Sequence, residues 1–152
     1  MNNPHKLNRM KNYILALGIA LSLFSCNKDA DKVLELESEV MTIHDDVMPQ
    51  MDDIMTLKSK LSRKIIHMDS LQNEGIAGNN IASERIKATE INQKLNESDK
   101  QMMDWMHEFR PDSAKKLKPE ETILYFEAQR KKIIEVKEFT SRNIQEAKTF
   151  LD

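Results

Sequence analysis

Residues 119–151 read PEETILYFEAQRKKIIEVKEFTSRNIQEAKTFL, and the spacing of their apolar side chains indicates one long helix. The only Pro is the first residue, and Gly is absent. Apolar residues recur at steps of mostly three and four, which places them on one stripe of an α-helix. The stripe is formed by Ile123, Phe126, Ile133, Val136, Phe139 or Thr140, Ile144, Ala147 and Leu151. Pro119 suits a first helical position, and Glu120 and Glu121 then face the positive end of the helix dipole.

Two earlier stretches, about 31–74 and about 79–110, have the same spacing. A segment with two glycines, 75–78, separates them, and a segment bounded by prolines, 110–119, leads to the third stretch. The apolar rows are Val33, Leu36, Val40, Ile43, Val47, Ile54, Leu57, Leu61, Ile65, Met68 and Leu71 in the first, and Ile81, Ala88, Ile91, Leu95, Met102, Met106 and Phe109 in the second. We therefore predict an all-α fold, an antiparallel three-helix bundle or coiled coil.

Pro49 lies inside the first helical stretch, where it removes one hydrogen bond and crowds the carbonyl of Asp45. The first helix is expected to be kinked or split there. Because this stretch is longer than the other two, residues 26–38 are expected to form a tether or stalk, and residues 39–152 the bundle. Gly75 can take the left-handed conformation that closes a helix.

Residues 1–25 have the pattern of a signal peptide. They contain three bases and no acid, and an apolar run extends from Tyr13 to Phe24. A helix of that length measures about 18 Å, too short for a bilayer core of about 30 Å. Met10, followed by Lys11, is an alternative start that would give a more compact leader. The fold is therefore expected to begin after residue 25.

The leader ends at Leu23-Phe24-Ser25-Cys26, which contains the only Cys of the chain. This motif resembles the lipobox of bacterial lipoprotein precursors, and the resemblance implies cleavage after Ser25 and lipidation of Cys26. More than one acyl chain there would anchor the protein stably, because a single chain binds only marginally. The chain also resembles small uncharacterised helical lipoproteins of Gram-negative bacteria, some of which are labelled viral A-type inclusion protein-like. That resemblance implies a lipid-anchored location in the cell envelope, at the outer membrane, facing the periplasm or the cell surface.

The composition argues against several classes of function. Lys plus Arg is 23 and Asp plus Glu is 25, which disfavours a nucleic-acid partner bound by a basic surface. A single Cys excludes a disulfide framework within the chain and a Cys-based zinc site. Three Gly are too few for a glycine-rich nucleotide loop. No catalytic combination of Ser, His and Asp or of Cys and His stands out, so we do not expect an enzyme.

Methionine is concentrated in two windows, each of which also holds one histidine. The windows contain Met41, His44, Met48, Met51 and Met55, and then Met102, Met103, Met106 and His107. The first five advance by three or four residues and therefore share a helix face. Folding the chain about residue 77 sets Met51 against Met103, Met48 against Met106 and Val47 against His107. Folding the chain about residue 115 brings Ile123, Leu124 and Phe126 toward the level of the two methionine windows along the bundle axis.

Three interpretations of these windows remain open. Met fills irregular gaps in cores, such as one next to Pro49. Thioether and imidazole groups together suit soft Cu(I), in an arrangement loosely similar to the Met/His/Trp sites of periplasmic copper chaperones. The ligands would be His44, Met48, Met51, Met103, Met106 and His107. A Met-rich groove could also bind a partner helix.

The nearby acids could in principle hold a hard cation, although a solvated helix face is the commoner role of such residues. They are Asp45, Asp46, Asp52, Asp53 and Asp104. The leading hypothesis is a membrane-anchored helical interaction or scaffold module without a cofactor. The alternatives are a Cu(I) or Ag(I) binder and a periplasmic holdase.

Overall fold

The computed structural model describes residues 28–76 and 78–152. The expected signal peptide, residues 1–25, and the expected lipidation site, Cys26, lie outside this part of the chain. Within it, no helix combines the length and the apolar character needed to cross a membrane.

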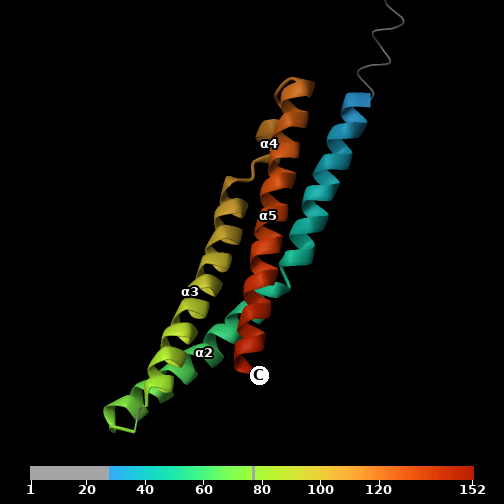
Figure 1. Cartoon of the computed structure of the whole chain (residues 1–152). Coiled ribbons are helices and arrows are strands. Elements are labelled where there is room, and N and C mark those ends of the chain that lie inside the picture. The colour runs from blue at the N-terminus through green and yellow to red at the C-terminus, as the bar shows by residue number, and fades with distance from the viewer. Residues whose placement is uncertain (1–27, 77) are drawn as a thin grey trace, which may run out of the picture.

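The described chain is all-α, as predicted, and no strand occurs in residues 28–76 or 78–152 (Figure 1). A helix over residues 28–47 is followed by α2 (Gln50–Asn73) and α3 (Asn79–Glu108). The single turn of α4 (Pro111–Ala114) precedes the long α5 (Pro119–Leu151). Three rods therefore form the bundle: residues 28–47 with α2, then α3, then α5.

The rods pack through seams with coiled-coil spacing. In α5 the buried side chains of the seam alternate between steps of four and three, the a and d pattern of a heptad repeat. They are Thr122, Phe126, Gln129, Ile133, Val136, Thr140, Asn143 and Ala147. In the first rod, buried residues recur every seven positions. These are Val40, Val47, Ile54, Leu61 and Met68.

The first rod runs parallel to α5. The Arg130 guanidinium donates to the Glu39 carboxylate at 2.7 Å, and the Lys137 ammonium donates to the Asp46 carboxylate at 2.8 Å. Both pairs are 91 residues apart in sequence, and a constant separation is the signature of parallel helices. These pairs lie on the flanks of the seam, where charged residues set the register of a coiled coil.

α3 runs antiparallel to the first rod and to α5. Lys58 of α2 lies 3.6 Å from Asp99 of α3, while Asp69, farther along α2, pairs with Arg85, nearer the start of α3. The turn between α2 and α3 includes Gly75, whose φ of +73° is the predicted left-handed conformation. The hairpin of α2 and α3 extends past the C-terminal end of α5 (Figure 1).

Pro49 bends the first rod without ending its seam. Pro49 has helical dihedral angles, φ −62° and ψ −25°, and the Met51 N–H donates to the Met48 carbonyl at 3.1 Å. Val47 and Ile54 are 0% and 1% exposed on either side of the bend. Because these two residues are one heptad apart, the buried seam continues across the bend, so residues 28–47 and α2, separated by the turn at residues 48–49, form one bent rod. The change of direction is visible where residues 28–47 meet α2 (Figure 1).

The start of the first rod differs from the stalk expected for residues 26–38. Residues 28–38 are helical, Leu36 is only 1% exposed, and the Glu37 carboxylate lies 2.7 Å from the Lys115 ammonium. Leu36 precedes Val40 by four residues, so it continues the same seam. This segment therefore packs against the connection between α3 and α5 instead of standing free of the bundle.

The register of α5 also differs from the expected one. Ile133 and Val136 pack with Met102 in one core cluster, whereas folding about residue 115 placed 123–126 at that level. The reason is the connection itself. It contains the turn of α4 and extends past the end of α3, so α5 starts farther along the bundle than a tight turn would allow.

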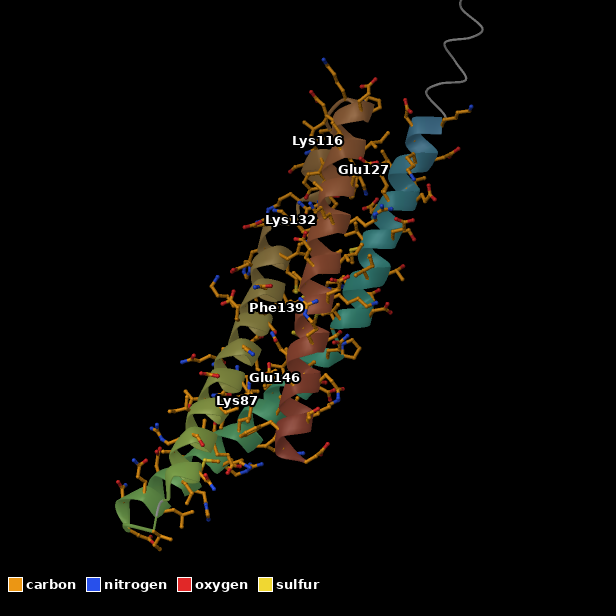
Figure 2. The ribbon with its side chains drawn as sticks, viewed as in Figure 1. Lys87, Lys116, Glu127, Lys132, Phe139 and Glu146 are labelled. Carbon is orange, nitrogen blue, oxygen red and sulfur yellow. The ribbon has the colours of Figure 1, made fainter. Side chains whose placement is uncertain are left out.

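One ion-pair network between α3 and α5 gives the bundle a pH dependence. The Lys87 and Lys94 ammonium groups each lie 2.6 Å from one oxygen of the Glu146 carboxylate, and Figure 2 labels Lys87 and Glu146 side by side. The hydrogen bond from Lys87, then that from Lys94, lowers the pKa of Glu146 below its ordinary value. The ionised carboxylate is therefore stabilised in the folded bundle more than in the unfolded chain.

Glu146→Gln is expected to lower the free energy of unfolding at pH 7 by up to about 1 kcal/mol, the range for exposed ion pairs. A carboxyl with a lowered pKa contributes its full effect above the unfolded pKa and loses it as pH falls through the folded pKa. The difference between the free energies of unfolding of wild type and variant should therefore disappear at acidic pH. Urea unfolding of both proteins from neutral to acidic pH measures this difference. A gap independent of pH would contradict the network's role.

Candidate methionine and histidine site

Most methionines of the described chain lie at the surface of the bundle. Met68 and Met102 are buried, at 5% and 0% exposure, and Met51 is half-buried. The other five are exposed over more than a third of their surface. They are Met41, Met48, Met55, Met103 and Met106. Core filling therefore accounts for Met68 and Met102 and part of Met51, and it leaves the concentration of exposed thioethers unexplained.

The exposed methionines of the first rod form a line. Met41, Met48 and Met55 are seven residues apart, and each directly follows a buried residue of the seam. Leu34, 63% exposed, continues this line one heptad toward the start of the rod. We refer to Leu34, Met41, Met48 and Met55 as the heptad stripe. It borders the side of the rod that faces α3.

Met51 of α2 and Met106 of α3 occupy matching heptad positions on two helices that pack together. Lys58 and Asp99, 3.6 Å apart, mark one level of this antiparallel pair. Met51 lies seven residues before Lys58, and Met106 lies seven residues after Asp99. Because each step is one heptad and the helices run in opposite directions, the two thioethers reach the same level. Met51 also packs against both hydrophobic clusters of the core.

His44 stands on the same side of the first rod. Its side chain is only 17% exposed, and its Nδ1 lies 2.9 Å from the Asp45 carboxylate. A carboxylate at Nδ1 favours the tautomer with the proton there, which leaves the Nε2 lone pair available to a ligand. Met48 lies one helical turn after His44, and Met51 lies two turns after it, so the three side chains line one side of the rod.

A ladder of aromatic rings continues from His44 into the bundle. The His44 and Trp105 ring centroids are 5.7 Å apart, and Trp105 stacks on Phe109 at 4.9 Å with an interplanar angle of 17°. Phe109 in turn stacks on Tyr125 and meets the edge of Phe126, both at 6.3 Å. Separations of this size are favourable for aromatic pairs. The sequence pattern placed Phe126 near the methionine windows but did not indicate the ladder.

His107 does not lie on the side of α3 that packs against the first rod. It is exposed, and its Nδ1 lies 2.7 Å from the Met103 carbonyl oxygen. The expected pairing of His107 with Val47 is wrong, because Val47 is fully buried and packs in the cluster that contains Trp105. Residue 107 is two positions beyond Trp105, about 200° around the helix, and therefore points outward. His44, Met48 and Met51 therefore share one side of the first rod, whereas His107 points away from it.

The acids around the methionines are largely paired with bases. Asp46 and Asp53 lie 2.8 and 2.9 Å from lysines of α5, and Asp104 pairs with Lys100. Among the described residues, no group of three or more His, Cys, Asp or Glu side chains could hold a metal ion.

Two features escaped the sequence analysis. A hollow of about 450 Å³ lies between the start of the first rod and the connection before α5, with Val33, Leu34 and Leu117 among its lining residues. Polar side chains also occupy seam positions, and the Asn143 amide donates to the Ser98 hydroxyl at 2.9 Å inside the bundle. Asn143 and Ser98 lie at the three-and-four spacing of the buried seams, but because both are polar, the pattern of apolar residues did not predict that they are buried.

The described residues thus define an all-α, three-rod bundle with coiled-coil seams and exposed methionines on the first rod and α3. Comparison with known proteins finds no matching family model, no matching curated protein and no matching solved structure.

Proposed function

We propose that the protein is a lipoprotein of the Gram-negative cell envelope whose bundle acts as an interaction or scaffold module rather than as an enzyme. The observation that carries the proposal is the succession of a lipobox-like motif ending at Cys26 and a helical bundle that is described from residue 28 onward. An anchor at that position would hold one end of the bundle against a membrane.

The position of Cys26 limits how far the bundle could stand from such a membrane. Cys26 precedes the first described helical residue by two positions, and two extended residues span about 7 Å. The connection before α5 lies at the same end, because Lys115 pairs with Glu37 (Figure 1). The turn between α2 and α3 would then be the part of the bundle farthest from the membrane.

The heptad stripe supports an interaction role. Leu34 and Met55 are 63% and 67% exposed, and the stripe runs along the first rod from residue 34 to residue 55. Exposed apolar residues in a row at heptad spacing are the pattern by which one helix binds another. Unbranched Met side chains adapt their shape to a partner, so a surface of this kind tolerates different partner sequences. A helical envelope protein is the kind of partner that this geometry fits.

Site-specific photo-crosslinking in intact cells tests the proposal. A photoreactive residue at Leu34 or Met55 is expected to form a crosslink to the same envelope protein from both positions. The matched controls are Glu127 and Lys131, which are exposed on α5. Crosslinks that are absent from the stripe, or equally strong from the control positions, would argue against a scaffold that uses this surface.

A further inference from the structure

The heptad stripe lies within an acidic segment of the first rod. Residues 33–57 contain seven acidic side chains and no Lys or Arg. The acids are Glu35, Glu37, Glu39, Asp45, Asp46, Asp52 and Asp53. The distribution of this charge around the rod determines which kind of partner the stripe can bind.

Four of these acids are neutralised by other parts of the bundle. Glu39, Asp46 and Asp53 lie 2.7, 2.8 and 2.9 Å from basic groups of α5. Glu37 lies 2.7 Å from the Lys115 ammonium of the connection before α5. These pairs leave little charge for a further partner on the sides of the rod where they lie.

The remaining acids border the heptad stripe. Asp45 and Asp52 each follow one methionine of the stripe by four residues and precede the next by three, and residues at these separations are neighbours on a helix surface. The Asp45 side chain is 73% exposed, and Asp52 is also exposed. Neither pairs with a Lys or Arg in the part of the chain that the structure describes. Glu35 directly follows Leu34, and its side chain is 58% exposed next to Lys32. The stripe is therefore an apolar row with an acidic border.

We propose that the heptad stripe binds a basic amphipathic helix, with apolar residues at heptad spacing and Lys or Arg beside them. This inference rests on the proposed interaction role and names the chemistry of the partner. The apolar row of such a helix would pack on the stripe, and its basic residues would pair with Asp45 and Asp52. Because Met adapts to partners of varied shape, the flanking charges would do most to select the partner.

The same border argues against a second copy of this chain as the occupant. Two stripes packed against each other would bring Asp45 and Asp52 of both copies to one interface, and residues 33–57 supply no Lys or Arg to separate them. Like charges at an interface disfavour binding. The charge pattern therefore favours a basic helix over self-association through the stripe.

Photo-crosslinking of the purified chain to defined peptides tests the charge preference. The full chain is reconstituted in nanodiscs of phosphatidylcholine, a lipid without net charge, and carries a photoreactive residue at Met55 or, as a control, at Glu127 of α5. Two peptides of about three heptads have the same apolar residues and differ only in their flanking Lys or Glu. At Met55 we expect half-maximal crosslinking at about 10 μM Lys peptide, with the Glu peptide about tenfold weaker. High salt should reduce the difference.

The chain offers a matched pair of variants. Asp45→Asn/Asp52→Asn is expected to weaken crosslinking to the Lys peptide about fivefold, because it removes the charges that border the stripe. Asp46→Asn/Asp53→Asn makes the same change one residue further along, on the side that pairs with α5, and should crosslink like the parent. Circular dichroism verifies that both variants are folded.

Several results would overturn the proposal. They are an absence of crosslinks to the Lys peptide, equal crosslinking of the two peptides, equal losses in the two double variants, and crosslinks from Met55 to a second copy of the chain in place of the peptide. Equal losses would mean a general attraction between opposite charges. This test fails independently of the crosslinking in cells, because an envelope partner found there without any preference for basic peptides would support the scaffold role and exclude only the chemistry inferred for its partner.

Discussion

Ile133→Ala is expected to lower the free energy of unfolding by about 2–5 kcal/mol, the range for large-to-small substitutions at buried aliphatic sites. Ile133 is fully buried in the cluster that joins Val40 and Val47 of the first rod to Met102 of α3. Alanine would leave a cavity at the level where all three rods meet. Small domains are stable by only about 5–15 kcal/mol, so the loss is a large share of the total.

Ile134→Ala is the matched control, because it makes the same chemical change at the next residue. Ile134 is 38% exposed, and substitutions at such positions usually change stability by less than about 0.5 kcal/mol. Urea unfolding followed by circular dichroism should show a lower midpoint for Ile133→Ala, with similar m-values for both variants. Equal losses at the two positions would mean that α5 does not present the heptad face assigned to it.

Much of the fold could be predicted because hydropathy reports helix faces directly. Ile133, Val136 and Phe126 are apolar, lie on one stripe, and are buried as expected. The polar seam positions could not be predicted in the same way. Asn143 is buried because it donates to Ser98 on α3, and that partner is known only once the two helices are docked in register.

The lengths of the connections between helices explain why the register of α5 was predicted less well than that of α3. The turn at Gly75 is tight, so residues on its two sides stay near the level that simple folding assigns, as Asp69 and Arg85 do. The connection before α5 includes the extra turn of α4, Pro111–Ala114, which moves every later residue along the bundle axis. A turn of this length has no strong signature in a sequence beyond its prolines.

The sequence places the methionine windows along the bundle but does not fix the rotation of each helix about its axis. Successive residues of a helix differ by about 100° in direction, so neighbours in sequence can point into the core or into solvent. Met102 is fully buried while Met103 is 45% exposed. Both residues lie in the same methionine window of the sequence, but only the packing of the helices determines which side chain is buried and which is exposed.

Cys26→Ser is expected to abolish both lipidation and cleavage of the leader. The proposed anchor depends on the thiol of Cys26, because a serine hydroxyl is a much weaker nucleophile for the attachment of a lipid. Wild-type cells fed labelled palmitate should therefore yield a labelled protein that lacks residues 1–25. The variant should be unlabelled and retain the leader, as mass spectrometry of the purified chain would show.

Ser25→Ala is the control for this change, since it alters the adjacent residue but keeps a small side chain before Cys26 and leaves the thiol in place. It should be labelled and processed like the wild type. Acyl chains stabilise membrane binding by about 0.8 kcal/mol per buried CH₂, so the processed protein should stay in the membrane fraction at high salt and leave it only in detergent. A wild-type protein that keeps its first residues and carries no acyl group would remove the anchor, and with it the envelope location.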